Sequence, residues 1–400
     1  MANPLTTPQD LTPAAPMHEL FNVAHSRPFS LLFGNYSWLL GAAGGLTLIW
    51  AIYVIAGHRR GVEYRFSLPL AVALIVGGFL NVLAEVQQPS RLIYGYFLGW
   101  QYWDTAIIKY GIILLPLYLA LCWWLTFQAM DRQALAAAIG RLGPRLGPVA
   151  DFFSLWSRHY SVLEKTGTRR GIVGLLIFLS LFAPMYSGIF LMNEHGVAIW
   201  NSPVQALLFM VSAGTQAALM MLVVLPLLAW LATGRYTQPL TVPLRWTAAI
   251  GVGVEAMIWF GWLWWIGRFG TIEELRAAQL YMGPYADIVF YHWTLIGIVA
   301  PFMLLVTPLG RYRWAQWLAA LGVMWGSYAI RMLVVIGGQA LIRSGAGYQS
   351  FTPSAESLLY TGCSVLAFIG ILAVLLLALP ADRAPELHSP APYPGGRRKD

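Results

Sequence analysis

The sequence predicts an all-α polytopic membrane protein with about nine transmembrane helices, and three observations support that fold class. Hydrophobic residues make up 58% of the 400 residues and charged residues only 10%, whereas water-soluble chains carry about 25% charged residues. Stretches without Asp, Glu, Lys or Arg recur along the chain, most of them close to the ~20 residues that a helix needs to cross a bilayer. Lys and Arg are concentrated in alternate loops between these stretches. These observations exclude a purely soluble enzyme.

The charge-poor stretches define the spans in chain order. The long stretch 196–234 is interpreted as one span, because Trp200-Asn-Ser-Pro203 is typical of a loop and a helix start. The third span is expected to begin nearer Thr105 than its first charge-free residue. The predicted spans are approximately 36–56, 66–84, 110–130, 171–193, 204–232, 243–266, 286–306, 314–340 and 356–379.

The loops give the orientation. Most of the 25 lysines and arginines fall in the loops after the first, third, fifth and seventh spans and in the C-terminal tail. Because cytoplasmic loops carry the excess of positive charge, the N-terminus is predicted outside and the C-terminus inside a bacterial inner membrane. We therefore expect an extracytoplasmic arm over 1–30, a transmembrane domain over 31–380 and a disordered cytoplasmic tail over 381–400. The inner loop 131–169 is predicted to contain an interfacial helix.

Ionisable residues within spans are costly and are therefore candidates for function. Most of them are predicted toward the outer face, and only Glu255 lies near mid-depth. Lys109 could extend to the interface, and Arg331 is expected to need a carboxylate partner or a water-filled cavity. The outer group consists of Glu85, Asp104, Lys109, His195, Asp287, His292, Arg331 and Glu356. For Asp104, Asp287 and Glu356 a simple interfacial position is an equal alternative.

Metal sites are disfavoured. A haem between helices needs two axial ligands at matched depth. Only His195 and His292 share the outer half, and His195 is predicted in a loop, so structural histidines are the better interpretation. The two cysteines, Cys122 and Cys363, cannot supply the four ligands of an iron–sulfur cluster. With only two cysteines, the chain is also not a disulfide scaffold. Any electron carrier is therefore expected in a partner subunit.

The segment between the second and third spans combines Glu85, Pro89 and Arg91 with several aromatic residues. An acid before the proline and an arginine after it could form a fixed ion pair at the membrane surface. An aromatic anchor in the interfacial belt is the alternative.

Four motifs resemble the NrfD-like family, the membrane subunits of polysulfide reductase and related complexes. The resemblance spans roughly residues 35–235. Its motifs are the small-residue run Gly41–Gly45, the element Glu85–Arg91, Tyr186-Ser-Gly-Ile-Phe-Leu, and Trp200-Asn-Ser-Pro203 followed by Phe209-x-x-Ser212. Glu85 replaces the aspartate of the family element and Gln88 replaces its first arginine. Residues 240–400 match less.

The resemblance implies a membrane subunit without a redox cofactor of its own. It implies docking on a periplasmic iron–sulfur subunit, which serves a molybdopterin catalytic subunit, so substrate catalysis is expected in a partner. It also implies a quinone or quinol (menaquinone or ubiquinone) bound near the outer surface. Tyr186 corresponds to the family's quinone-contacting tyrosine, with Asn35 and Tyr36 as candidates on the first span. No histidine stands on that span where the family often has one.

The chemistry of the residues is compatible with this function. A quinone site needs hydrogen-bond donors, an apolar slot and titratable groups in contact with water. Tyr186 is a plausible donor, although a buried tyrosine can equally well serve an interhelical hydrogen bond. Glu85, Asp104 and Glu255 are proton-transfer candidates. Glu255 could link electron transfer to proton translocation, or it could simply pair with Arg331 or a backbone group.

Two other functions compete with this hypothesis. A secondary transporter would have polar or broken helices at mid-depth and an internal repeat. Pro184 and Pro226 could break helices, but no repeat is evident and the polar groups lie off-centre. A structural or assembly subunit without a ligand would tolerate substitution of Tyr186 and Glu85. Nucleic acid is not an expected partner, because the net charge of +8 is explained by the cytoplasmic loops.

Overall fold

The computed structural model describes residues 29–58, 61–86, 97, 107–129, 166–193, 197, 199–200, 202–340 and 351–378. Within these residues the fold is helical and nine helices are long and apolar enough to cross a membrane. The predicted fold class and number of spans are therefore confirmed for this part of the chain. Most of the predicted N-terminal arm, the predicted cytoplasmic tail and most of the predicted inner loop with its helix lie outside the described residues. So do Arg91, Asp104 and His195.

The helices follow the predicted order with small changes at their ends. They are α1 (Leu31–Ile55), α2 (Val62–Glu85), α4 (Ile108–Ala129), α8 (Thr166–Met192), α9 (Val204–Thr233), α10 (Thr241–Phe269), α11 (Ile272–Met282), η5 (Ile288–Val299), α12 (Ala300–Val306), η6 (Pro308–Arg311), α13 (Arg313–Met332), η7 (Leu333–Gly337) and α14 (Ala355–Ala378). The stretch after Pro203 forms one long helix, as expected. The short helix α11 was missed because its composition is mixed rather than apolar. It begins at a capping box in which Thr271 and Glu274 satisfy each other's backbone N–H groups.

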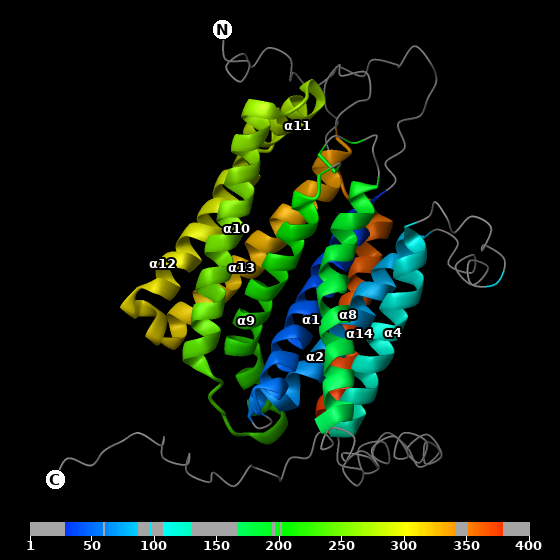
Figure 1. Cartoon of the computed structure of the whole chain (residues 1–400), viewed down its shortest axis with the longest axis vertical. Helices are drawn as coiled ribbons and strands as arrows, with labels where there is room; N and C mark the ends of the chain where they lie inside the picture. Colours follow the sequence, from blue (N-terminus) through cyan, green and yellow to red (C-terminus); the bar gives the residue numbers. More distant parts are fainter. Residues whose placement is uncertain are drawn as a thin grey trace.

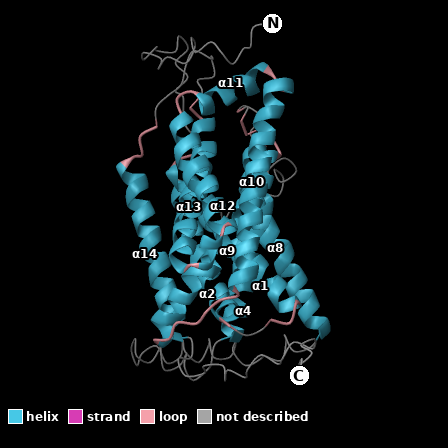
Figure 2. Cartoon of the chain, turned by 90° about the vertical axis from the view of Figure 1, so that its left-hand side faces the viewer, coloured by secondary structure: helices cyan, strands magenta, loops and turns pink. Residues whose placement is uncertain are grey.

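The long helices run side by side along the long axis of the molecule (Figure 1). Helix α1 is central and packs against α2, α8, α9, α13 and α14. Helix α14 lies against α2, at the edge of the bundle in the second view (Figure 2). We call the end of the bundle where α1 begins the upper face and the opposite end, where α14 ends, the lower face.

Glycines bring α1 close to its neighbours. A Cβ atom on Gly45 would lie 2.1 Å from the carbonyl oxygen of Ala213 on α9, and one on Gly44 would lie 2.8 Å from that of Ser180 on α8. The backbones approach this closely because glycine has no side chain. The expectation that the run Gly41–Gly45 packs tightly on a neighbouring helix is confirmed.

Two features depart from simple α-helices. The seventh span is π-helical over Ile288–Val299, and the eighth is π-helical over Leu333–Gly337. In contrast, Pro184 and Pro226 lie inside the continuous helices α8 and α9. The suggestion that these two prolines break their helices was therefore wrong.

Candidate functional site at the upper face

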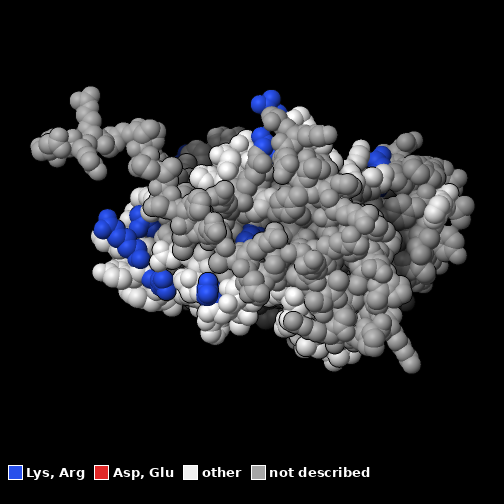
Figure 3. Space-filling model, turned by 90° about the horizontal axis from the view of Figure 1, so that it is seen from below, with Lys and Arg blue, Asp and Glu red and all other residues white. Residues whose placement is uncertain are grey.

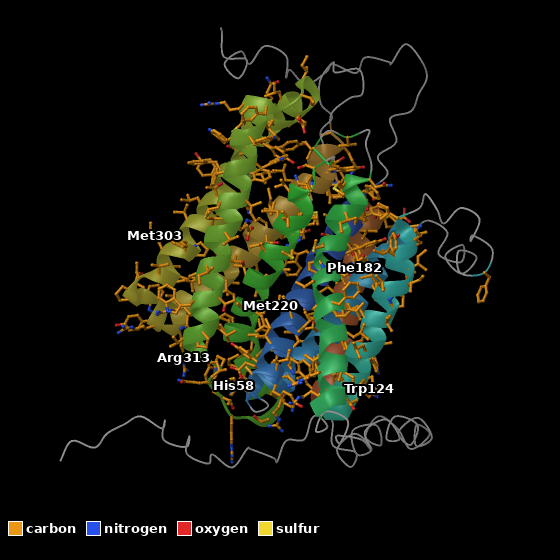
Figure 4. The ribbon with its side chains drawn as sticks, in the orientation of Figure 1. His58, Trp124, Phe182, Met220, Met303 and Arg313 are labelled. Carbon is orange, nitrogen blue, oxygen red and sulfur yellow. The ribbon has the colours of Figure 1, made fainter. Side chains whose placement is uncertain are left out.

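Aromatic side chains fill the upper part of the contact between α1 and α8. We call them the aromatic cluster: Phe29, Phe33, Tyr36, Phe182, Tyr186, Phe190 and Trp200. The ring centroid of Tyr186 lies 5.3 Å from that of Phe182 and 6.1 Å from that of Phe190. The ring centroids of Phe33 and Tyr36 lie 5.7 Å apart. Phe182, labelled on α8 in Figure 4, is the lowest member on that helix. The cluster offers flat apolar surfaces at spacings suited to aromatic contact.

Tyr36 and Tyr186 belong to the same cluster and are linked through two phenylalanines. Phe33 packs against Tyr36 and Phe190, and Phe190 packs against Tyr186. Both tyrosine side chains are buried. Tyr186 also hydrogen-bonds with the backbone of Gly111 on α4. Gly111 lies near the start of α4, and a Cβ atom on it would lie 2.2 Å from the hydroxyl oxygen of Tyr186. The hydroxyl hydrogen of Tyr186 remains available for donation.

Asn35 points to a different side of α1. Its amide nitrogen donates to Thr361 at 2.9 Å and to Asn81 at 3.3 Å, and its oxygen accepts from the hydroxyl of Tyr328 at 3.0 Å. This network ties α1 to α2, α13 and α14. Asn35 is therefore not brought together with Tyr186, and its amide is already engaged.

Glu85 anchors the beginning of α1. Its carboxylate accepts from the backbone N–H and the hydroxyl of Ser30, both at 2.5 Å. Ser30 in turn caps α1 by accepting from the N–H of Leu32. The geometry gives Glu85 a clear structural task at the upper face, a short distance along α1 from the aromatic cluster.

Two further candidates lie apart from the cluster. Lys109 begins α4 and lies over the ring of Tyr110, 5.2 Å from its centroid. His292 lies in the π-helical span and accepts at Nδ1 from the indole N–H of Trp325 at 3.1 Å. This hydrogen bond is compatible with the expected structural or hydrogen-bonding histidine.

Arg331 is completely buried between α1, α9 and α13. Its guanidinium group donates to the hydroxyl of Ser212 at 2.7 Å and to the carbonyl oxygen of Phe209 at 3.1 Å. It also lies over the Phe209 ring. The groups that accept these hydrogen bonds are therefore neutral. Gly41 leaves room for the guanidinium, since a Cβ atom there would lie 2.8 Å from Nη2.

Glu255 is the buried carboxylate that interacts electrostatically with Arg331. Its direct hydrogen bond comes from the indole N–H of Trp293 at 3.2 Å. On the neighbouring helix α9, the side-chain amides of Gln205 and Gln216 are buried without a partner among the described residues. Buried polar groups of this kind commonly take up water.

Among the residues that the structure describes, no group of three or more His, Cys, Asp or Glu side chains could hold a metal ion. The polar chemistry of the described upper half is therefore that of hydroxyls, amides and single charged groups.

Comparison with known proteins gives the family. Residues 20–343 match the family model described as "Polysulphide reductase, NrfD". The chain is also 26% identical to "Protein NrfD" of Escherichia coli (strain K12) over 192 residues, which is 46% of this chain and 56% of that relative. The aligned part thus spans only about half the length of the relative. The chain belongs to the NrfD family.

The NrfD family consists of membrane subunits of oxidoreductase complexes, and the family match explains why the motifs occur in this order. The match extends beyond the range 35–235 that the motifs indicated. It includes α10 and all elements through η7, and it ends before α14. Glu255 and Arg331 therefore lie within the region that matches the family.

One buried carboxylate of this NrfD protein escaped the sequence reasoning. Glu63 begins α2 at the lower face and accepts from the backbone N–H of Leu240, at the start of α10. It is only 4% exposed. The sequence places it in a loop beside several arginines, which gave no signal that the chain would bury it.

Proposed function

We propose that this chain is the cofactor-free membrane anchor of a respiratory oxidoreductase complex and binds quinone or quinol at the aromatic cluster. Electrons would pass between the quinone and a periplasmic iron–sulfur subunit that serves a molybdopterin subunit. The observation that carries the proposal is that Tyr36 and Tyr186 lie in one buried aromatic cluster, linked by the rings of Phe33 and Phe190. Membership of the NrfD family adds support.

The residues of the cluster fit a quinone ring. A quinone supplies two-electron, two-proton redox chemistry when bound. The apolar rings of Phe33, Phe182 and Phe190 provide stacking surfaces, and they would exclude water from a flat ligand. The hydroxyl of Tyr186 would donate to a ring oxygen, while the N–H of Gly111 holds the tyrosine in place. Glu85 and Asp104 would exchange protons with the outer solution.

The proposed orientation puts the upper face outside. Among the described residues visible on the lower face, Figure 3 displays basic side chains in blue and no acidic side chain in red. The described arginines at that end are Arg65, Arg169, Arg170, Arg235, Arg245, Arg311 and Arg313. An excess of positive charge favours the cytoplasmic side of a bacterial inner membrane.

The first test substitutes Tyr186→Phe in the complex purified from native membranes. Quinol-dependent turnover should fall about tenfold or more, since one hydrogen-bond donor to the ring is lost. Tyr118→Phe is the matched control, because Tyr118 is a buried tyrosine bonded to Thr47 well below the cluster. Unchanged turnover and unchanged inhibitor binding in Tyr186→Phe would contradict the proposal. If the chain is purified from native membranes without an iron–sulfur subunit, the proposed complex with that subunit is contradicted.

We also propose that Glu255 couples the reaction to proton translocation. Support comes from its burial within the membrane-spanning part of α10 and from its electrostatic interaction with the buried Arg331. In proteoliposomes, Glu255→Gln should abolish proton movement across the membrane while much of the quinol turnover remains. Equal proton movement per turnover in the variant and the wild type would refute this role.

A further inference from the structure

Two buried hydroxyl groups in the contact between α1 and α8 make no hydrogen bond. They belong to Ser37 and Ser187, which follow the two tyrosines of the proposed site directly in the sequence. Their exposed fractions are 2% and 0%. Neither Oγ atom has a partner among the described residues.

The register of the two helices brings these serines to the same level. Helices α1 and α8 pack with opposite directions, with Thr47 bonded to Ser180 lower down and Phe33 in contact with Phe190 higher up. Ser37 and Ser187 each lie between these pairs on their helices. Helical periodicity keeps Ser187 on the face of α8 that presents Ser180, since seven residues are close to two turns. Both hydroxyls therefore belong to this interface at the height of Tyr36 and Tyr186.

Other buried serines in the helices of the bundle do form hydrogen bonds. A serine in a helix can satisfy itself on a carbonyl group of the preceding turn, as Ser67 does on Glu63 and Ser212 does on Phe209. Ser37 and Ser187 do not. A buried hydroxyl without a hydrogen bond is unfavourable. These two hydroxyls lie beside the aromatic cluster, where an oxygen atom of a bound ligand would satisfy them.

We propose that the hydroxyls of Ser37 and Ser187 together hold one oxygen atom of the quinone ring. This inference rests on the proposed function and adds the second polar contact of the same site. A hydroxyl group both donates and accepts. The same pair therefore donates to the carbonyl oxygen of an oxidised ring and accepts from the hydroxyl of a reduced one. Tyr186 and Ser187 serve the site from α8, and Ser37 serves it from α1.

The test measures binding of ubiquinone-1 and of menadione to the purified full chain in detergent by calorimetry, together with the apparent unfolding temperature. Ser187→Ala and Ser37→Ala should each weaken binding of the better probe about five- to thirtyfold, the effect of losing one hydrogen bond. Their unfolding temperatures should stay the same or rise, since an unbonded hydroxyl is removed. Ser187→Thr, which keeps a hydroxyl group, should retain most of the affinity.

Ser180→Ala is the matched control. Ser180 is also buried on α8 and faces α1, but its hydroxyl is bonded to Thr47 at 2.7 Å. This variant should lower the unfolding temperature and leave probe affinity unchanged. The inference is overturned if Ser187→Ala and Ser37→Ala bind the probe as tightly as the wild type, which would indicate a bridging water instead. If the wild type itself binds neither probe, the proposed function fails as well, so the two failures are distinguishable.

Discussion

The contact between α1 and α8 contains two levels with opposite hydrogen-bonding character. At the lower level, Thr47 bonds to Tyr118 at 2.5 Å and to Ser180 at 2.7 Å, so three hydroxyls from three helices satisfy one another. At the upper level, Ser37 and Ser187 are unbonded and lie beside the aromatic cluster. Both levels are buried and both use small hydroxyl residues.

This difference separates packing from function. The lower level gains stability because every buried polar group has a partner. The upper level gives up that stability, which is expected where side chains are kept ready for a ligand. Substitutions at the two levels should therefore affect different properties, and the following predictions test that separation.

The largest expected effect is on packing at the lower level. Gly44→Ala would place a methyl group 2.7 Å from Pro184 and 2.8 Å from the carbonyl oxygen of Ser180. We expect a loss of about 3 kcal/mol in unfolding free energy, because α1 must move away from α8. Thermal unfolding in detergent measures it. Gly174→Ala on α8, which has nothing within 4 Å, is the control and should be neutral or slightly stabilising. Equal unfolding temperatures of the two variants would argue against close packing.

The next effect is at the upper level. In Gly111→Ala, the added methyl group would lie 2.2 Å from the hydroxyl oxygen and 2.3 Å from the ring of Tyr186. The tyrosine must shift, which should cost about 2 kcal/mol of stability. Quinol-dependent turnover should fall about tenfold although no hydroxyl is removed. Steady-state kinetics of the intact complex decide the point, and wild-type turnover would separate Tyr186 from the site.

A smaller effect is expected from Thr47→Val, which keeps the shape and removes the shared hydroxyl. Tyr118 and Ser180 would lose their common partner, and we expect destabilisation by about 1–2 kcal/mol. Quinone affinity should not change, because the substitution lies at the lower level. Calorimetric unfolding and probe titration on the same preparation measure both properties. Weakened quinone binding would show that the two levels are not independent.

The smallest effect is expected from Glu63→Ala at the lower face. The start of α10 would lose the acceptor for the Leu240 N–H. Because a buried carboxylate is itself costly to remove from water, the net loss should be only about 1 kcal/mol. Limited proteolysis should cut the connection between α9 and α10 faster than in the wild type, with unchanged quinol turnover. Unaltered cleavage would contradict the proposed tether.

Much of the architecture was predictable because a bilayer constrains composition. The spans around Gly41–Gly45 and after Pro203 followed from length and hydrophobicity alone. The π-helical turns in the seventh and eighth spans did not, since they depend on how neighbouring helices meet. The contact of Gly297 with Gly326, where an added Cβ atom would lie 2.4–2.7 Å from the opposing Cα atom, is one such meeting.

The site was predictable only in part. Tyr186 and Tyr36 were named from motif positions, and both lie in the aromatic cluster. Asn35 was named beside Tyr36, yet one residue along a helix turns a side chain by about 100° and directs it to other neighbours. Ser37 and Ser187 gave no signal of their own, because the sequence does not indicate whether a serine hydroxyl finds a partner.

The sequence by itself determined the nine apolar helices, the biased distribution of positive charge and the residue types available at the upper face. These properties follow from the transfer of side chains between water and lipid, which acts on each segment separately. The tertiary structure decided which of these residues come together: Tyr36 and Tyr186 in one cluster, Asn35 with α14, and Arg331 with the carbonyl of Phe209. The physical reason is that helix rotation and close glycine contacts set these pairings, and both depend on several helices at once.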